Sequence, residues 1–307
     1  MTSASSLVSV GIPAYNHARV VGDALRSAMA QSYKNLEILV VDNHSEDQTD
    51  RVVADIAAGD PRVRYVRHAE NLGMARNFSA CISLAKGEFV QILCADDVLD
   101  PGCAAALANA LRSNPEAVLA ACGRILTDEN LKPVRVVRAR TRREVVPGLA
   151  LLRECFSYSN LIGEPTAVMF RRAAASRGFH PDYSQAVDLE MWMHLLTHGA
   201  AILLPEPLCR IRRHAAQASH ENVRSGRVVE DKQRLFRDYG PALSGELSLT
   251  EKLMWDARMA LSIQRVQAAG RRLNVSDPTE IFFPGLFRRV MLPAGALARR
   301  LIHPPTG

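Results

Sequence analysis

The sequence predicts an α/β protein whose central, mostly parallel sheet is flanked by helices. First, short apolar runs rich in β-branched residues alternate with stretches whose apolar residues recur at helical spacing. Second, these segments follow one another as strand, helix, strand through the first third of the chain, which is typical of parallel crossovers. Third, a composition of 48% hydrophobic and 23% charged residues in a chain of 307 indicates a globular protein with a large core.

In the first third of the chain, strands are expected over residues 7–12, 36–41, 63–66 and 89–93. Helices are expected between them over residues 20–29, 51–58 and 74–85.

The middle of the chain is expected to add strands over residues 118–125, 166–170, 201–204 and 208–212 and helices over 103–113, 148–156 and 188–198. Residues 131–146 read as an edge strand or a mobile basic segment, and 157–165 as a loop. Helical periodicity returns over 223–239 and 249–269. We therefore expect one large domain over residues 1–219 and a helical C-terminal extension over residues 220–307.

The net charge of +6 points to anionic partners, for which phosphorylated substrates, anionic lipid and nucleic acid all qualify. Nucleic acid ranks last, because the sequence has neither zinc-finger spacing nor a basic-aromatic RNA-binding pattern. The six cysteines form no C-x-x-C pair, which favours reduced thiols in a cytoplasmic protein. We expect neither a secretory signal nor a membrane span.

The strand over residues 89–93 is followed closely by the adjacent carboxylates of Asp96 and Asp97, before a break at Pro101-Gly102. Ligands of open α/β sheets bind at the carboxyl ends of the strands. Two neighbouring carboxylates need a positive partner, and their oxygens suit magnesium or manganese carrying a phosphorylated substrate. A solvated turn with helix-capping aspartates is the competing interpretation.

Other strand and helix ends carry similar signals. Tyr15 and Asn16 follow the first strand, and the ring of Tyr15 could stack on a nucleobase or pack within a turn. Asp42 ends the second strand, where it could accept a hydrogen bond from the imide of uracil or cap the next helix. Arg76 lies near a helix N-terminus, which suits either a diphosphate contact or a surface arginine.

Several segments together resemble family 2 glycosyltransferases of the GT-A fold. They are residues 8–16 (VSVGIPAYN), 38–49 (ILVVDNHSEDQT), 71–77 (NLGMARN), 87–101 (GEFVQILCADDVLDP), 163–172 (GEPTAVMFRR) and 188–192 (DLEMW). The resemblance covers about the first two-thirds of the chain and ends near residues 210–219. Its ordered motifs are specific for the family but not for a donor or an acceptor.

The resemblance implies a nucleotide-sugar donor, usually a UDP-sugar, and an inverting, metal-assisted single displacement. It assigns the nucleotide to Pro13, Tyr15, Asn16, Asp42 and Arg76. It assigns manganese or magnesium to Asp96, with Asp97 toward the metal or the sugar, and the catalytic base to Asp188. It assigns the sugar and acceptor side to Glu164, Pro165, Thr166 and Trp192.

Some assignments stay open at this point. Asp188 has a competing interpretation as a helix N-cap, and Glu190 is the alternative base. His214 could reach the diphosphate or the metal, or face solvent. Cys94 stands where the family commonly has an acid, which prompts the alternative of a catalytically silent sugar-nucleotide-binding or scaffold protein. A nucleotidyltransferase is disfavoured, because no glycine-rich loop follows the first strand.

Residues 281–302 combine bulky apolar residues with paired arginines. This pattern fits an interfacial helix on an anionic membrane, which would suit a lipid-linked acceptor at the cytoplasmic face. Packing on the first domain or on the partner of a homodimer is the alternative. The expected product is a cell-surface polysaccharide or glycolipid.

Overall fold

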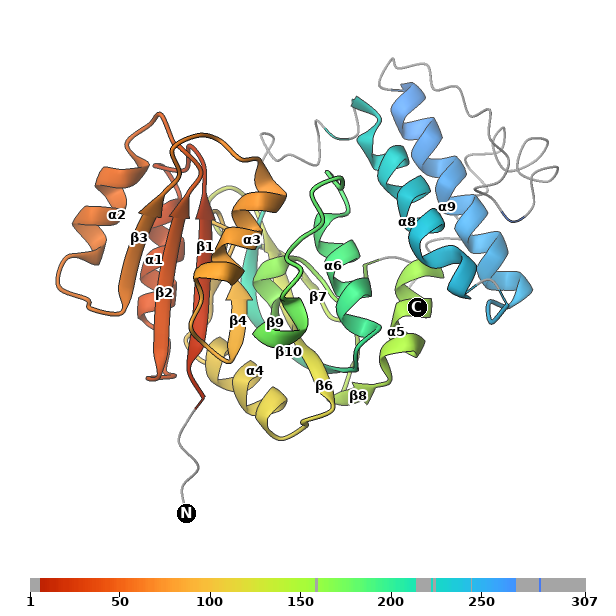
Figure 1. The fold of residues 1–307 in the computed structure, drawn as a ribbon, viewed down its shortest axis with the longest axis horizontal. Coiled ribbons are helices and arrows are strands. Elements are labelled where there is room, and N and C mark those ends of the chain that lie inside the picture. The colour runs from red at the N-terminus through yellow and green to blue at the C-terminus, as the bar shows by residue number, and fades with distance from the viewer. Residues whose placement is uncertain are drawn as a thin grey trace. The chain divides into compact units, whose positions relative to one another are not determined.

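The computed structural model describes residues 6–157, 160–213, 222, 225–243, 245–268 and 282 (Figure 1). The chain divides into two compact units. The first comprises Met1–Leu151, Ile162–Pro181 and Met191–His214, and the second comprises Leu152–Leu161, Asp182–Glu190 and Ala215–Gly307. The division into domains at residue 219 stays a prediction.

Within the described residues, all strands belong to one sheet in the first unit. They are β1 Val8–Ala14, β2 Leu36–Asp42, β3 Val63–Arg67, β4 Phe89–Ile92, β5 Val98–Leu99, β6 Ala117–Thr127, β7 Pro133–Val137, β8 Glu144–Val146, β9 Val168–Arg171 and β10 Ala200–Arg212. Their order across the sheet is β3-β2-β1-β4-β9-β6-β10-β5, with β7 paired to β6 and β8 to β10.

The helices of the described residues are α1 Val21–Met29, α2 Thr49–Ala57, α3 Met74–Leu84, α4 Cys103–Arg112, α5 Gly148–Ser157, α6 Val187–Leu196, α8 Arg227–Leu243 and α9 Leu249–Ala268. Two short 3₁₀ turns flank β9, namely η1 Pro165–Ala167 and η2 Arg172–Ala175. None of the described helices is long and apolar enough to cross a membrane.

The predicted α/β class is confirmed. The strands β3, β2, β1 and β4 pair in parallel, as the alternation of strands and helices predicts. Beyond β4 the sheet is mixed, because β9 runs antiparallel to both β4 and β6. The ladder between β1 and β2 extends to the pair Ala14 and Asp42, so both strands end at the same edge.

Successive residues of β1 point to opposite faces of the sheet. Val8, Val10 and Ile12 are fully buried and belong to one cluster with apolar residues of α1 and α4. A Cβ at Gly11 would point the other way, toward Cys81 of α3. A Cβ at Gly11 would lie 2.7 Å from the Cβ of Cys81, so the absence of a side chain permits the close approach of α3.

The structure departs from the sequence expectations in three places. The two-residue strand β5 was not expected, since periodicity cannot be recognised over so short a run. The strand expected over residues 166–170 begins as the turn η1. The strands expected over residues 201–204 and 208–212 are one strand, β10, whose pairing with β6 shifts register on both sides of Pro207.

In the second unit, aromatic residues hold the helices together. The rings of Phe156 and Trp255 stack with centroids 4.2 Å apart, and Phe236 packs against both. Arg153 of α5 forms two hydrogen bonds, of 2.8 and 2.6 Å, with the carboxylate of Glu251 in the first turn of α9. These contacts tie α5 to α8 and α9.

Candidate active site

The loops after β1 and β2 are hydrogen-bonded to each other at one edge of the sheet. Asn16 has a φ of 55°, which suits asparagine, and its Oδ1 accepts a hydrogen bond of 2.8 Å from the N–H of Glu46. Its own N–H donates to Ser45 at 2.9 Å. Asn16 therefore shapes this loop pair. Pro13 is buried within β1, opposite Val41.

Tyr15 and Asp42 differ sharply in their exposure. Tyr15 is 39% exposed, whereas Asp42 is fully buried. The carboxylate of Asp42 accepts hydrogen bonds from the N–H of Ser45 at 2.8 Å and from the hydroxyl of Tyr65. Burial, followed by the hydrogen bond to Asp42, raises the pKa of Tyr65. Asp42 is thus anchored at the end of β2, and Tyr15 presents an accessible aromatic surface.

Cys94, Asp96 and Asp97 come together after β4. One ligand atom from each lies within 4.8 Å of the others. Cys94 and Asp96 are partly exposed, whereas Asp97 is only 2% exposed. Burial, and next the charge of Asp96, raises the pKa of Asp97 well above its ordinary value. The two adjacent carboxylates therefore favour a cationic partner, as the sequence predicts.

Asp97 is fixed by groups from two distant parts of the first unit. Thr166 of η1 donates its hydroxyl hydrogen to Asp97 Oδ2 at 2.5 Å, and the backbone N–H of Arg212 donates to Oδ1 at 2.9 Å. The hydroxyl of Thr166 also accepts a hydrogen bond of 3.1 Å from the N–H of Cys94. Thr166 is fully buried, so the structure places it beneath the acids.

The side chain of Arg212 also contacts the turn that carries Asp96 and Asp97. Its Nε donates to the carbonyl of Asp96 at 2.8 Å, and its guanidinium also contacts Asp23 at 2.7 Å and the carbonyl of Glu129 at 2.8 Å. We did not expect this role from the sequence. The run of arginines at the end of β10 was the available signal, but it does not indicate which arginine turns toward the acids.

Whether this site suits a divalent cation depends on the ligand atoms that Cys94, Asp96 and Asp97 offer. Within the part of the chain that the structure describes, Cys94, Asp96 and Asp97 are the one group of potential metal ligands. Carboxylate oxygens suit magnesium and manganese, while the thiol is a softer donor. Asp97 is buried and both of its oxygens accept hydrogen bonds, so the partly exposed Asp96 is the more accessible ligand. The donor set fits a divalent cation.

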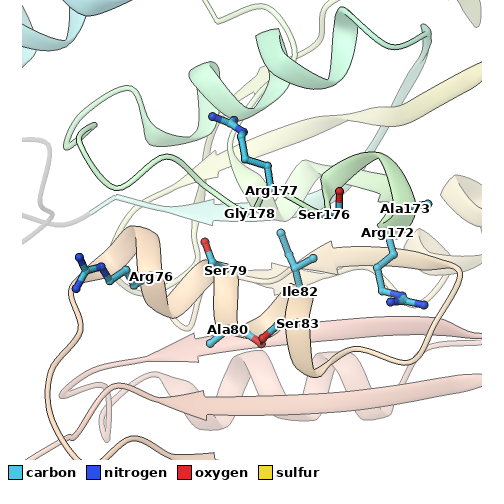
Figure 2. Close-up of a pocket in the computed structure, with 10 residues that line it drawn as sticks. All are labelled: Arg76, Ser79, Ala80, Ile82, Ser83, Arg172, Ala173, Ser176, Arg177 and Gly178. Carbon is cyan, nitrogen blue, oxygen red and sulfur yellow. The ribbon is translucent and has the colours of Figure 1, made fainter.

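Arg76 lines a cavity of about 530 Å³ between α3 and the segment that begins at η2 (Figure 2). Arg172 and Arg177 line it too, together with serines of both segments. Figure 2 shows the three guanidinium groups pointing in different directions. Arg76 is exposed in the first turn of α3, as expected from the sequence.

The segment before η1 is held by charge. Glu164 forms ion pairs of 2.5 Å with both Arg124 and Arg213. Pro165, which is buried, opens η1. Trp192 is also fully buried, and its indole N–H donates to the carbonyl of Gly163 at 2.9 Å. Trp192 therefore supports the loop before Glu164 from within the core.

Asp188 and Glu190 lie in the second unit, at the start of α6. Asp188 is partly exposed, and its carboxylate accepts hydrogen bonds from Asn160 at 3.0 Å and from the N–H of Leu189 at 2.7 Å. Glu190 is 2% exposed and accepts a hydrogen bond of 2.8 Å from Tyr239. His214 lies outside the described residues, as does the segment 281–302 apart from Phe282.

The profile of glycosyl transferase family 2 matches residues 9–179. The chain belongs to this family, and it is accordingly a transferase enzyme with a role in sugar transfer.

The uncharacterized protein MT1568 of Mycobacterium tuberculosis is 34% identical over 243 residues, which cover 76% of this chain and 75% of that protein. An uncharacterized glycosyltransferase of Haemophilus influenzae is 27% identical over 236 residues, or 73% of this chain and 72% of the relative.

Solved structures share the fold. Residues 1–349 of Staphylococcus aureus TarS, in complex with UDP-GlcNAc, match 96% of this chain and 88% of theirs, with a TM-score of 0.59 and 17% identity. The mannosyltransferase PcManGT of Pyrobaculum calidifontis, in complex with GDP-Man and Mn²⁺, matches 99% of this chain and 82% of its own, with a TM-score of 0.60 and 21% identity. The expected GT-A fold is confirmed.

Proposed function

We propose that the chain transfers a sugar from a nucleotide-sugar, a UDP-sugar in the first instance, to a hydroxyl group of a glycan or a lipid-linked acceptor. The observation that carries the proposal is the gathering of an accessible aromatic ring, Tyr15, and a pair of acids, Asp96 and Asp97, after parallel strands of one sheet. The complexes of TarS with UDP-GlcNAc and of PcManGT with GDP-Man support a nucleotide-sugar donor.

On the nucleotide side, the exposed ring of Tyr15 stacks on the base. Asp42 is buried beneath Ser45 and Tyr65, so a contact between its carboxylate and uracil requires these partners to share it. Asn16 shapes the loop that carries Tyr15, and Pro13 lies in β1 just before that loop. Arg76, exposed on the first turn of α3, contributes positive charge toward the diphosphate.

Asp96 would hold a divalent cation, manganese or magnesium, and Asp97 would present its carboxylate to the metal or the sugar from the orientation that its own hydrogen bonds fix. When bound, such a cation neutralises the charge that develops on the departing diphosphate. Thr166 and Arg212 keep the turn that carries both acids in place. The Mn²⁺ in the PcManGT complex supports this assignment.

Asp188 is the general base that removes the proton from the attacking hydroxyl group. A single displacement with one base inverts the configuration of the anomeric carbon. Exposure favours Asp188 over Glu190, since Glu190 is buried and engaged with Tyr239. Glu164 and Pro165 line the sugar and acceptor side, and Trp192 acts there through Gly163.

The acceptor class is a growing glycan or a lipid-linked sugar of the cell surface, used at the cytoplasmic face of a membrane. A chondroitin synthase of Pasteurella multocida, which is 29% identical over 203 residues, supports a glycan acceptor. That alignment covers 63% of this chain and 19% of the synthase. Membrane association through residues 281–302 and homodimer formation belong to the same proposal, and no nucleic acid is involved.

A thermal-shift screen of UDP-, GDP- and dTDP-sugars, with and without Mn²⁺, tests the proposal. We expect a UDP-sugar to stabilise the protein more strongly with Mn²⁺, and Asp96→Asn to remove the metal-dependent part. Glu88→Gln is the matched control, because Glu88 is an exposed acid just before β4 that pairs with Arg171. If no nucleotide-sugar stabilises the protein under either condition, the proposal is wrong.

A further inference from the structure

Asp231 of α8 is almost completely buried, at 1% exposure, and lies against the backbone that leads into α6. We propose that Asp231 is a positioning residue that fixes the N-terminus of α6 and thereby the carboxylate of Asp188. The inference rests on the proposed role of Asp188 as the base. Every contact that it uses lies within the second unit.

One oxygen of Asp231 accepts three successive backbone hydrogen bonds. The N–H groups of Ser184, Gln185 and Ala186 donate to its Oδ2 at 2.9, 2.5 and 2.8 Å. Three successive N–H groups around one oxygen form an anion-binding nest. The other oxygen faces the guanidinium of Arg234 at 3.6 Å. The carboxylate therefore holds this stretch of backbone in one conformation.

The beginning of α6 explains why the acceptor comes from another helix. The carbonyl of Ala186 accepts the first hydrogen bond of the helix, from the N–H of Glu190 at 2.8 Å. An N-cap residue usually supplies a side-chain oxygen, and alanine has none. Asp231 places its negative charge where the positive end of the helix dipole favours it. Its hydrogen bonds go to Ala186 and the two residues before it, so Asp231 anchors the backbone that enters the helix.

Further contacts of the second unit hold the same segment. Asn222 donates to the carbonyl of Ser184 at 2.9 Å. Tyr183 donates its hydroxyl hydrogen to Asp238 at 2.6 Å, and Tyr239 donates to Glu190 at 2.8 Å. Asp231 differs from these residues because it accepts from three successive backbone N–H groups, whereas the others bind a side chain or a single carbonyl.

The consequence for Asp188 follows from its place in the helix. It is the second residue of α6, two positions after the last N–H that Asp231 binds. Its oxygens accept hydrogen bonds from Leu189 and Asn160, and a shift of the backbone at the start of α6 would move the whole carboxylate. A displacement of about 1 Å at a reacting group can lower the rate by about 100-fold.

The experiment measures UDP release from the UDP-sugar that the thermal-shift screen selects. We expect Asp231→Leu to lower kcat by about 10- to 100-fold with the donor KM unchanged. Asp231→Asn retains an acceptor oxygen but loses its charge, so we expect a smaller loss, about 3- to 10-fold. In the Asp188→Asn background neither change lowers kcat by more than about twofold, because the group that Asp231 positions is already gone.

Glu251→Gln is the matched control. It removes a buried charge from the second unit and lowers stability through Arg153, but it does not contact the residues before α6. We expect its kcat to stay within about twofold of the parent protein. A loss of kcat in the Asp231 variants but not in Glu251→Gln would show that the loss comes from positioning and not from lower stability.

An unchanged kcat in both Asp231 variants overturns the inference, and so does an equal loss with and without Asp188. If Asp231→Leu does not fold, the same cycle with Asp231→Asn decides. Failure of the proposed function looks different, because Asp188→Asn alone then leaves kcat unchanged or no UDP-sugar binds.

Discussion

The hydroxyl of Thr166 donates a hydrogen bond of 2.5 Å to Asp97, across 69 residues of sequence, and both side chains are buried. The same hydroxyl accepts from the N–H of Cys94. Thr166 therefore links the turn that carries the acids to η1, and its hydroxyl can be replaced by a methyl group with only a small change in the volume of the side chain.

Thr166→Val should lower the free energy of unfolding by about 1–3 kcal/mol, because it removes the hydroxyl that binds Oδ2 of the buried Asp97 and the N–H of Cys94, and only the bond from Arg212 to Oδ1 of Asp97 stays. Equilibrium urea unfolding measures the change. Thr127→Val is the control, since Thr127 is equally buried but donates only one longer bond, 3.3 Å, to the carbonyl of Ile211. Equal losses in the two variants would contradict the role given to Thr166.

Asp188→Asn should lower kcat by about 10²- to 10⁴-fold, the range found for removal of a general base. Glu190→Gln should leave kcat nearly unchanged and lower stability, because Glu190 is buried against Tyr239. Steady-state kinetics of UDP release, together with a melting curve for each variant, check both statements. The reverse pattern would make Glu190 the base.

Gly11→Ala should destabilise the first unit by about 1–3 kcal/mol, since the new methyl group would lie 2.7 Å from Cys81 Cβ and force α3 away from β1. Gly102→Ala is the matched control, because nothing lies within 4 Å of a Cβ at that position. It should be neutral or stabilising by up to about 1 kcal/mol. A shift in the urea midpoint that is the same for both variants would refute the packing argument.

The stability of the second unit should depend on pH through Glu251. The hydrogen bond from Arg153, with a further one from Ser248, lowers the pKa of Glu251 from 4.5 to about 2. A lowered carboxylate pKa stabilises the folded state fully above the unfolded value, and this contribution is lost as the pH falls from about 4.5 to about 2. Glu251→Gln should therefore be less stable than the parent at pH 7, and the difference should shrink across that window.

Tryptophan fluorescence can follow the second unit alone. The chain has two tryptophans, of which Trp192 belongs to the first unit and Trp255 to the second. Denaturant unfolding in a Trp192→Phe background then reports the surroundings of Trp255. If Glu251→Gln differs from its parent in stability by the same amount from about pH 7 to about pH 3, the assigned cause is excluded.

Local patterns were sufficient for the parallel half of the sheet. The runs that became β1, β2 and β4 are short, apolar and β-branched, and the helical spacing between them leaves few topologies other than parallel crossovers. The position of the acids after β4 follows from the same reasoning. The local sequence of β9 does not show that the strand runs antiparallel to its neighbours, because the same apolar run would fit a parallel strand equally well.

Which polar residues are accessible could not be predicted from the sequence. Asp42, Thr166 and Trp192 lie in the segments that resemble the family, yet all three are buried in the folded protein. Burial depends on what packs over a residue from elsewhere in the chain, as Tyr65 does over Asp42. No local pattern signals such a partner.

The sequence by itself determined the α/β class, the family and the order of the acidic and aromatic positions along the strand ends, because these depend on residue type and on spacing between neighbours. Only the tertiary structure decided that Arg212 and Thr166 hold the acids, and that Asp231 holds the residues before Asp188. Those contacts join residues 45 to 115 positions apart, and hydrogen bonds over such separations exist only once the chain has folded.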